Sequence, residues 1–175
     1  MRYVLVIAGI AAGLVVVIAI IGSLLPRDHV ATVRATIPAS REKILAVLTD
    51  VAAFPTWRPD VQRVEILSKP PAPLSWREYS KRGSLTFVTE TLEPNRLIGR
   101  IADENLPFGG AWEYDLAPDG ADSARTLLTI TERGYVSNPI FRFVSRFVMG
   151  HYATLESYMK SLGRKFGEEV RPTRV

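Results

Sequence analysis

Few side chains in this 175-residue chain are suited to proton transfer, which narrows the chemistry that it could perform. Histidine occurs only twice, at His29 and His151, and the chain contains no cysteine. Disulfides, thiolate metal sites and cysteine nucleophiles are therefore excluded. His29 is expected at the membrane collar, so His151 has no second histidine beside it in the folded domain, and a histidine-based metal site is improbable. We expect neither a bound metal nor a cofactor.

His151 is the more informative of the two histidines. It falls on the apolar stripe of a long helical pattern, one turn from both Phe147 and Leu155, so its ring should point toward the rest of the fold. One interpretation is a group that lines a cavity, and the other is a buried, hydrogen-bonded histidine with a structural role. His29 stands just after an apolar N-terminal run and is most simply an interfacial polar residue.

Two glutamates are the remaining acid–base candidates. Strand alternation places Glu78 on the same face as Trp76, and Glu132 on the same face as Ile130. In an apolar concavity, desolvation would raise the pKa values of these carboxyl groups and suit them to proton transfer. The alternative is that both lie near strand ends, in water or paired with an arginine. The nearby arginines are Arg58, Arg77 and Arg133.

Motifs of the common enzyme classes are absent. The chain has no phosphate-binding glycine loop, no Gly-x-Ser-x-Gly elbow, no His-Glu-x-x-His and no acidic calcium loop. Together these absences favour binding over group transfer or hydrolysis. The net charge of +4 is mild, and acidic residues are scattered through the chain, so we expect no nucleic-acid partner.

The first 25 residues are expected to form a transmembrane helix. Tyr3 to Leu25 carries no charge over 23 residues, a helix of ~35 Å against a hydrocarbon core of ~30 Å. A cleaved signal peptide is the alternative, but its apolar region is normally ~7–15 residues long. Gly9 and Gly13 form a small-xxx-small pair that suits a homodimer, or they are ordinary membrane-helix residues.

The side of the membrane that the remaining chain occupies stays open. Only Arg2 precedes the span, whereas basic residues come soon after it, which favours a cytoplasmic domain. A very short N-terminus before a long apolar run also suits a signal anchor that exports the rest of the chain. We therefore expect a single-pass membrane protein whose orientation the sequence does not decide.

Seven strands are expected beyond the span, because apolar and polar residues alternate and glycine, proline or asparagine turns separate the runs. A helix capped by Ser40 and ending near Asp50 comes after the first strand, and a proline-braced turn that contains Trp57 comes next. Short connections between the later strands indicate an antiparallel meander. The strands cover residues 31–37, 61–67, 74–80, 84–92, 96–102, 110–117 and 124–133.

One helix over residues 137–166 is expected to cover this sheet. Asn138 is a suitable N-cap, Pro139 suits the first helical position, and apolar residues then recur at three- and four-residue spacing. Such a helix would be ~40 Å long, so the sheet must curl around it. The fold class is therefore α+β, with one antiparallel sheet and a long C-terminal helix.

Four stretches of this sequence resemble the START-like or helix-grip superfamily (SRPBCC), which includes polyketide cyclase/dehydrase and lipid-transfer proteins. They are Ile37 to Ser40, Phe54 to Val61, Thr129 to Gly134, and the helix start from Asn138 to Phe143. The resemblance implies a curved seven-stranded antiparallel sheet wrapped around the C-terminal helix, with a cavity that often takes an apolar ligand. It implies no particular reaction, because the superfamily contains carriers, enzymes and proteins without a known ligand.

The expected organisation combines these observations. Residues 1–25 form the transmembrane helix, 26–29 a juxtamembrane collar, 30–167 the helix-grip ligand-binding domain and 168–175 a flexible tail. The resemblance also places Trp57 beside the cavity mouth, where it would act as part of a lid or pack under the loop. We assign the half of the long helix from Ile140 to His151 to the cavity wall, and the half from Leu155 to Leu162 to a packing seam.

Three functions are compatible with the sequence. The first is a membrane-anchored binding protein for a hydrophobic, lipid-like small molecule; the second is a cyclase, dehydrase or hydrolase that uses Glu78, Glu132, Tyr114 or His151. The third is an interaction module in a membrane complex, without a ligand. In the first, the ligand is held between two walls. The helix wall consists of Phe143, Phe147 and His151, and the sheet wall of Phe87, Trp112 and Tyr114.

Overall fold

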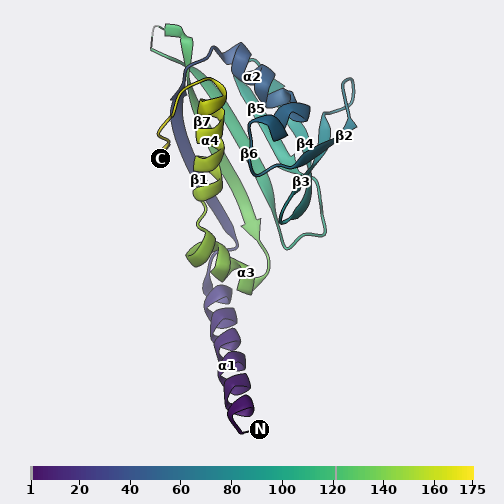
Figure 1. Cartoon of the computed structure of the whole chain (residues 1–175), viewed down its shortest axis with the longest axis vertical. Coiled ribbons are helices and arrows are strands. Elements are labelled where there is room, and N and C mark those ends of the chain that lie inside the picture. Colours follow the sequence, from purple (N-terminus) through teal and green to yellow (C-terminus); the bar gives the residue numbers. More distant parts are fainter. Residues whose placement is uncertain (1, 121) are drawn as a thin grey trace.

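A long N-terminal helix extends from a domain that contains one antiparallel sheet and several short helices (Figure 1). The computed structural model describes residues 2–120 and 122–175. Helix α1 (Arg2–Leu24) leads into the first strand, and the C-terminus returns to lie beside that strand. The α+β class and the single N-terminal helix are as the sequence predicts.

The sheet has eight strands in the order β2-β3-β4-β5-β6-β7-β1-β8. Neighbours from β2 to β7 are consecutive in the chain, so this part is the meander that the short turns predict. Every one of the seven expected strands is present. The bounds are β1 (Asp28–Ile37), β2 (Arg63–Ser68), β3 (Ser75–Ser80), β4 (Gly83–Glu93), β5 (Arg96–Ile101), β6 (Phe108–Asp119) and β7 (Asp122–Val136).

The core lies on the concave face of the sheet, where β1 pairs with β7 along the whole length of β1. Val33 opposes Ile130 and Ala35 opposes Leu128, and all four side chains are buried. Because side chains alternate across a strand, His29 and Glu132 share this face with them. The strand register therefore directs a histidine and a carboxylate into the concavity at one end of the sheet.

The C-terminal tail differs from the expectation of a frayed segment. Strand β8 (Thr173–Arg174) pairs with β1, and Arg174 Nε donates a 2.6 Å hydrogen bond to Glu156 Oε1. Val170 is buried against Gly163, so the tail is folded back onto the domain. With β8, the sheet has eight strands instead of the seven expected. A two-residue strand is too short to show alternation in the sequence, so β8 could not be predicted.

Two helical elements come after β1, as predicted. Helix α2 (Arg41–Thr49) begins after Ser40 and buries Ile44 and Leu48 on one face. A 3₁₀ helix, η1 (Val51–Thr56), then buries Phe54 and leads into the turn that contains Trp57. Helix α2, which Figure 1 labels, contacts β6, and η1 contacts β2.

The expected single helix over residues 137–166 is divided into three pieces. They are α3 (Pro139–Val144), the π-helix η2 (Ser145–Met149) and α4 (Ala153–Lys165). The break lies at Gly150, whose φ of 71° is accessible to glycine at little cost. Apolar spacing continues on both sides of this residue, which is why periodicity alone predicts one continuous helix.

The division separates the two expected functions of the helix. Helix α4 packs on the sheet with Leu155, Met159 and Leu162 fully buried, so the predicted packing seam is correct. The predicted cavity wall is wrong for Phe147, whose side chain is 60% exposed. Phe143 contacts Phe147 on the same segment, with ring centroids 4.9 Å apart. This segment instead packs beside the end of α1 (Figure 1).

Helix α1 is long and apolar enough to span a membrane. Nearly all its side chains are exposed, and Gly22 in its last turn is the buried position. Gly9 and Gly13 have no atom within 4 Å of an added Cβ, so their shared face is open. The homodimer through these glycines stays a prediction.

Candidate ligand-binding site

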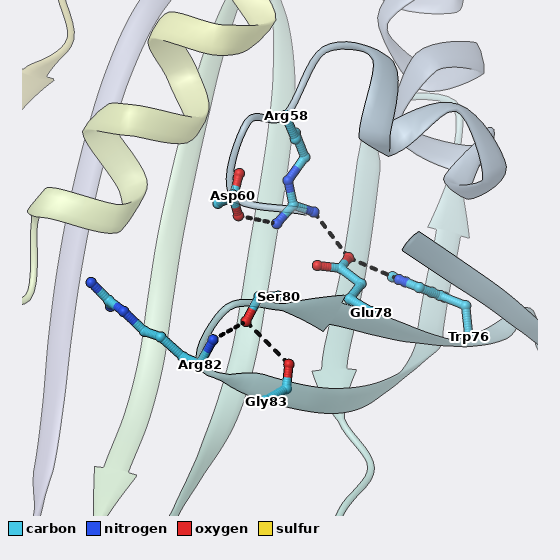
Figure 2. Close-up of polar contacts among 7 residues, drawn as sticks. All are labelled: Arg58, Asp60, Trp76, Glu78, Ser80, Arg82 and Gly83. Carbon is cyan, nitrogen blue, oxygen red and sulfur yellow. Dashed lines mark hydrogen bonds and ion pairs between the residues drawn. The ribbon is translucent and has the colours of Figure 1, made fainter. Parts of the chain in front are cut away.

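A buried ion pair occupies the concave face beside the turn that follows η1 (Figure 2). Arg58 Nη1 donates to Glu78 Oε1 at 2.9 Å, and Trp76 Nε1 donates to the same oxygen at 2.9 Å. Arg58 Nη2 also donates to Asp60 Oδ2 at 2.8 Å. The side chains of Arg58 and Glu78 are only 11% and 10% exposed. The predicted pairing of Glu78 with an arginine is therefore observed, with Arg58 as the partner.

Local structure explains why Arg58 points inward. The turn after η1 is closed by the Arg58 amide, which donates to the Phe54 carbonyl at 2.8 Å. The guanidinium then lies over the rings of Phe54 and Tyr158, 5.0 and 5.1 Å from their centroids. Burial alone would lower the pKa of Arg58, but the adjacent Glu78 carboxylate and the other anions nearby outweigh it and raise the pKa. Arg58 is a permanent cation inside the concavity.

Two tyrosines stand beside this ion pair. Burial raises the pKa of Tyr114 well above its usual value, and the neighbouring Tyr158 raises it further. Burial also raises the pKa of Tyr158 to about 12, although Arg58 opposes the shift. Both phenols are therefore protonated at neutral pH, and they serve as hydrogen-bonding groups rather than as bases.

A histidine cluster forms the other polar site on the concave face, and we define it as His29, His151 and Glu132. The two imidazole rings stack with centroids 4.1 Å apart, and His29 Nε2 lies 3.4 Å from Glu132 Oε1. Ser145 Oγ lies 3.5 Å from His151 Nδ1. Burial lowers the pKa of His151, and His29 lowers it further, while Glu132 partly opposes them. His151 is therefore neutral at pH 7.

Sequence reasoning missed His29 as a member of this cluster. Gly134 pairs with His29 across β1 and β7, and an added Cβ on Gly134 would lie 2.6 Å from His29 Cε1. The absence of a side chain at Gly134 thus makes room for the imidazole. The sequence did contain a signal for it. His29 is an even number of residues from the apolar residues of the first strand, so its side chain should lie on the same face of the sheet as theirs.

Aromatic side chains lie between the two polar sites. Trp76 stacks on Phe87 with centroids 5.6 Å apart, and Trp112 meets Tyr158 of α4 edge to face at 5.4 Å. Phe87 and Trp112 are partly buried. Gly99 of β5 lies opposite Trp112, and an added Cβ there would meet only Trp76, at 4.0 Å. One further carbon atom would therefore fit on the concave face at Gly99, in ordinary contact with the Trp76 ring.

The region under α4 is filled by side chains. Its residues Leu155, Met159 and Leu162 have no exposed surface, and Trp57 packs against Tyr158 with centroids 5.4 Å apart. A hollow of about 330 Å³ lies elsewhere, where the C-terminal segment passes the edge of β1. Polar and charged residues, among them Arg34, Arg125 and Glu168, line much of it. Over Gly99, by contrast, an added carbon atom would meet only the Trp76 ring.

The structure groups most of the predicted site residues. Trp57, Glu78, Phe87, Trp112 and Tyr114 belong to the aromatic and ion-pair region, and Glu132 and His151 belong to the histidine cluster. Phe143 and Phe147 lie outside both. In the described part of the chain, no hydrogen bond joins any two of the four expected acid–base groups.

The histidine cluster does not have the geometry of a metal site. Within residues 2–120 and 122–175, no three side chains of histidine, aspartate or glutamate are arranged to hold a metal ion. The cluster supplies two imidazoles and one carboxylate, but the rings stack instead of directing their nitrogens at one point. The contacts within the cluster are a ring stack and hydrogen bonds.

Comparison with known protein families shows which family the chain belongs to. A family model described as "Polyketide cyclase / dehydrase and lipid transport" matches residues 28–164. The chain belongs to this family. The match covers β1 through most of α4 and leaves out α1 and the C-terminal segment. No curated protein sequence matches the chain.

Solved structures agree with the family assignment at the level of the fold. A START superfamily protein from Mycobacterium smegmatis is 20% identical, with a TM-score of 0.59 over 79% of this chain and 97% of its own. The Zhui aromatase/cyclase from Streptomyces sp. R1128 is 14% identical, with a TM-score of 0.63 over 79% and 93%. Truncated norcoclaurine synthase from Thalictrum flavum is 12% identical, with a TM-score of 0.65 over 81% and 94%.

These findings confirm the START-like, helix-grip fold that the four sequence stretches predict. Family and fold together indicate a START/polyketide cyclase-like ligand-binding domain. The two enzymes among the similar structures share a fold with this chain at identities that carry no residue roles, so any activity must be argued from the residues of this chain.

Proposed function

We propose that this protein is a single-pass membrane protein whose domain binds an apolar or amphipathic, lipid-like small molecule on the concave face of the sheet. The observation that carries this proposal is the open position over Gly99, beside the partly buried Phe87 and Trp112. An aromatic surface with free space and few polar groups is the usual lining of a small-molecule site. Each Å² of apolar ligand surface buried there would contribute ~25 cal/mol.

Polar groups at the two sides of this surface suit an amphipathic ligand. Arg58 and Glu78 lie on the β3 side and offer a fixed charge pair, while the histidine cluster lies on the β1 side and offers a neutral imidazole. A ligand with an apolar body and one hydrogen-bonding end fits this distribution. Helix α1 supports the membrane assignment by its length and composition, and it would keep the domain where such ligands are concentrated.

The direct test is to identify the small molecules that the full-length protein carries out of its own membrane. The protein is extracted with a membrane-solubilising polymer rather than detergent, and bound small molecules are identified by mass spectrometry. Gly99→Leu fills the open position on the concave face, whereas Ile98→Leu changes the neighbouring residue on the opposite face and serves as the control. We expect one enriched compound with the wild type and Ile98→Leu, and its loss with Gly99→Leu. No enriched compound in repeated preparations would contradict the proposal and favour the interaction module.

An acid–base enzyme is the second candidate, and the histidine cluster is the observation that favours it. A neutral imidazole at His151, beside His29 and Glu132, is suited to accept a proton from a bound substrate. The same mass spectrometry separates the two functions. If the protein is an enzyme, His151→Gln should carry a compound of different mass from the wild type, namely unconverted substrate. If it is a binding protein, only the amount of the same compound should change.

A further inference from the structure

Exposed large hydrophobic side chains of the domain are concentrated on the segment between β7 and α4. We define the end patch as Ile140, Phe141, Phe147 and Val148, which are 39%, 51%, 60% and 72% exposed. Four such side chains within nine residues are more than scattered surface hydrophobicity requires. They belong to α3 and η2, the segment that sequence reasoning assigned to the cavity wall.

Helix α3 is held firmly against the last turn of α1. A Cβ on Gly22 would overlap the Pro139 carbonyl group, so the two backbones touch at this point. The Arg142 guanidinium then binds three backbone carbonyls from two segments, the end of α1 and the end of β7. Its Nε donates to Val136 at 2.9 Å, Nη1 to Leu25 at 3.2 Å and Nη2 to Ser137 at 2.8 Å.

This contact fixes the depth of α3 relative to the membrane. The uncharged run of α1 ends at Leu25 and is followed by Pro26, Arg27 and Asp28, so the boundary between hydrocarbon and water lies there. Gly22 is three residues before Leu25, a rise of ~4.5 Å along the helix. A helix that touches Gly22 therefore lies at the level of the bilayer interface. Figure 1 shows α3 beside this end of α1, between α1 and the sheet.

The charges around the end patch suit the same location. Arg146 is exposed on η2, and Arg27 is exposed where it lies over the Tyr135 ring, 5.0 Å from the centroid. Apolar side chains at the acyl boundary with arginines beside them are typical of interfacial helices, because the arginines reach the headgroups. Exposed arginines thus occur in the end-patch segment itself and in the segment that follows α1.

We propose that the α3–η2 segment lies in the lipid interface, with the end patch inserted among the acyl chains. This inference rests on the proposed membrane anchoring by α1, and its partner is the bilayer that α1 spans. The segment and α1 then hold the domain in one fixed orientation instead of leaving it on a flexible tether. The membrane-proximal end of the sheet is the end that carries the histidine cluster, since His29 lies four residues beyond Leu25 and the Val136 amide donates to the Arg27 carbonyl at 2.9 Å.

The inference deepens the proposed function, because a ligand would pass between the bilayer and the concave face at this end without crossing water. Exchange of a lipid-like molecule at an interface avoids the cost of exposing its apolar surface to water.

The absence of cysteine allows a site-specific test in the full-length protein. Phe141→Cys and Val148→Cys each carry a nitroxide label in the end patch. Leu14→Cys labels the middle of α1, and Leu92→Cys labels an exposed apolar position, 57% accessible, far from α1 on β4. Each variant is reconstituted in vesicles of phosphatidylcholine and phosphatidylglycerol. Collision rates with oxygen, which enters the bilayer, and with a water-soluble nickel chelate report the depth of each label.

We expect the labels at positions 141 and 148 to collide several-fold more with oxygen relative to nickel than the label at position 92 does, and to approach the value at position 14. If position 14 is immersed but positions 141 and 148 match position 92, the interfacial inference is overturned while the anchor stands. If position 14 is itself accessible to nickel, the proposed anchoring fails and the inference fails with it. Circular dichroism of each labelled variant verifies that the domain is folded.

Discussion

The contact between α1 and α3 can be broken by one methyl group. In Gly22→Ala, the new Cβ would lie 2.6 Å from the Pro139 carbonyl carbon and still closer to its oxygen, whereas real contacts of this kind do not fall below 3.0 Å. The two backbones must then separate by on the order of 1 Å, because neither side of the contact is a flexible side chain. Separation also lengthens the 3.2 Å hydrogen bond from Arg142 Nη1 to Leu25.

The magnitude comes from the general cost of overpacking, ~1–3 kcal/mol. If the cost falls on the docked state of α3, transient undocking becomes about 5- to 150-fold more frequent. Hydrogen–deuterium exchange of the full-length protein in lipid nanodiscs measures this directly. Amides of residues 139–150 should exchange faster in Gly22→Ala by a factor in that range, while the strands keep their protection.

Gly13→Ala is the matched control, because an added Cβ on Gly13 meets no atom within 4 Å. It makes the same chemical change two and a half turns earlier in the same helix and should leave the exchange of residues 139–150 unchanged. Equal exchange in the two variants would show that α3 is not packed on the last turn of α1.

Three further predictions concern the polar sites. Arg58→Met should lower the free energy of unfolding in urea by about 3–5 kcal/mol because it leaves Glu78 buried without its cation, while Arg58→Met/Glu78→Leu should lose less. The pKa of His151 is lowered from 6.5 in the folded protein, so the unfolded chain takes up the proton first as the pH falls. The free energy of unfolding should therefore decrease below pH 6.5, and its dependence on pH should be flatter in His151→Gln. Identical pH profiles of the two proteins would contradict this. Gly134→Ala should displace the His29 ring and remove the ring-current shift of His151 in proton NMR spectra, and an unchanged shift would show that the rings are not stacked.

The strands and the first helix could be predicted because local chemistry decides them. Val33 and Ile37 alternate with polar residues, and the turns between later strands contain the residues that tight turns require. The apolar run of α1 was equally explicit. In each case the signal lies within one window of sequence, where period and turn chemistry agree.

The errors arose where the fold depends on contacts between distant segments. Gly150 interrupts a helical pattern whose apolar spacing resumes afterwards, so only packing shows that α3 turns toward α1 instead of the sheet. Phe147 was placed by that pattern in a cavity, and it lies on the surface. The tail gave no signal for β8, because its pairing with β1 depends on the fold of the whole domain.

Part of the candidate site could be predicted, because some of its features depend on local sequence alone. Strand parity placed Glu78, Trp112 and Glu132 on the concave face, since alternation is a local property. The interaction partners of these residues were harder to predict. Arg58 was one of several possible cations for Glu78, and the stacking of His29 on His151 joins residues 122 positions apart. Such a pairing requires the register of β1 against β7 and the break at Gly150 together.

Photocrosslinking of a lipid-like probe most directly tests whether the concave face holds a ligand. A fatty acid that carries a diazirine is added to vesicles that contain the full-length protein, and the labelled residues are mapped by mass spectrometry after irradiation. We expect labelling on the concave side of β4–β6, around Phe87, Gly99 and Trp112, in addition to α1, and loss of the β4–β6 labelling alone in Gly99→Leu. Labelling restricted to α1 and the α3–η2 segment would contradict a ligand site on the concave face and would leave the domain as a membrane-bound interaction module.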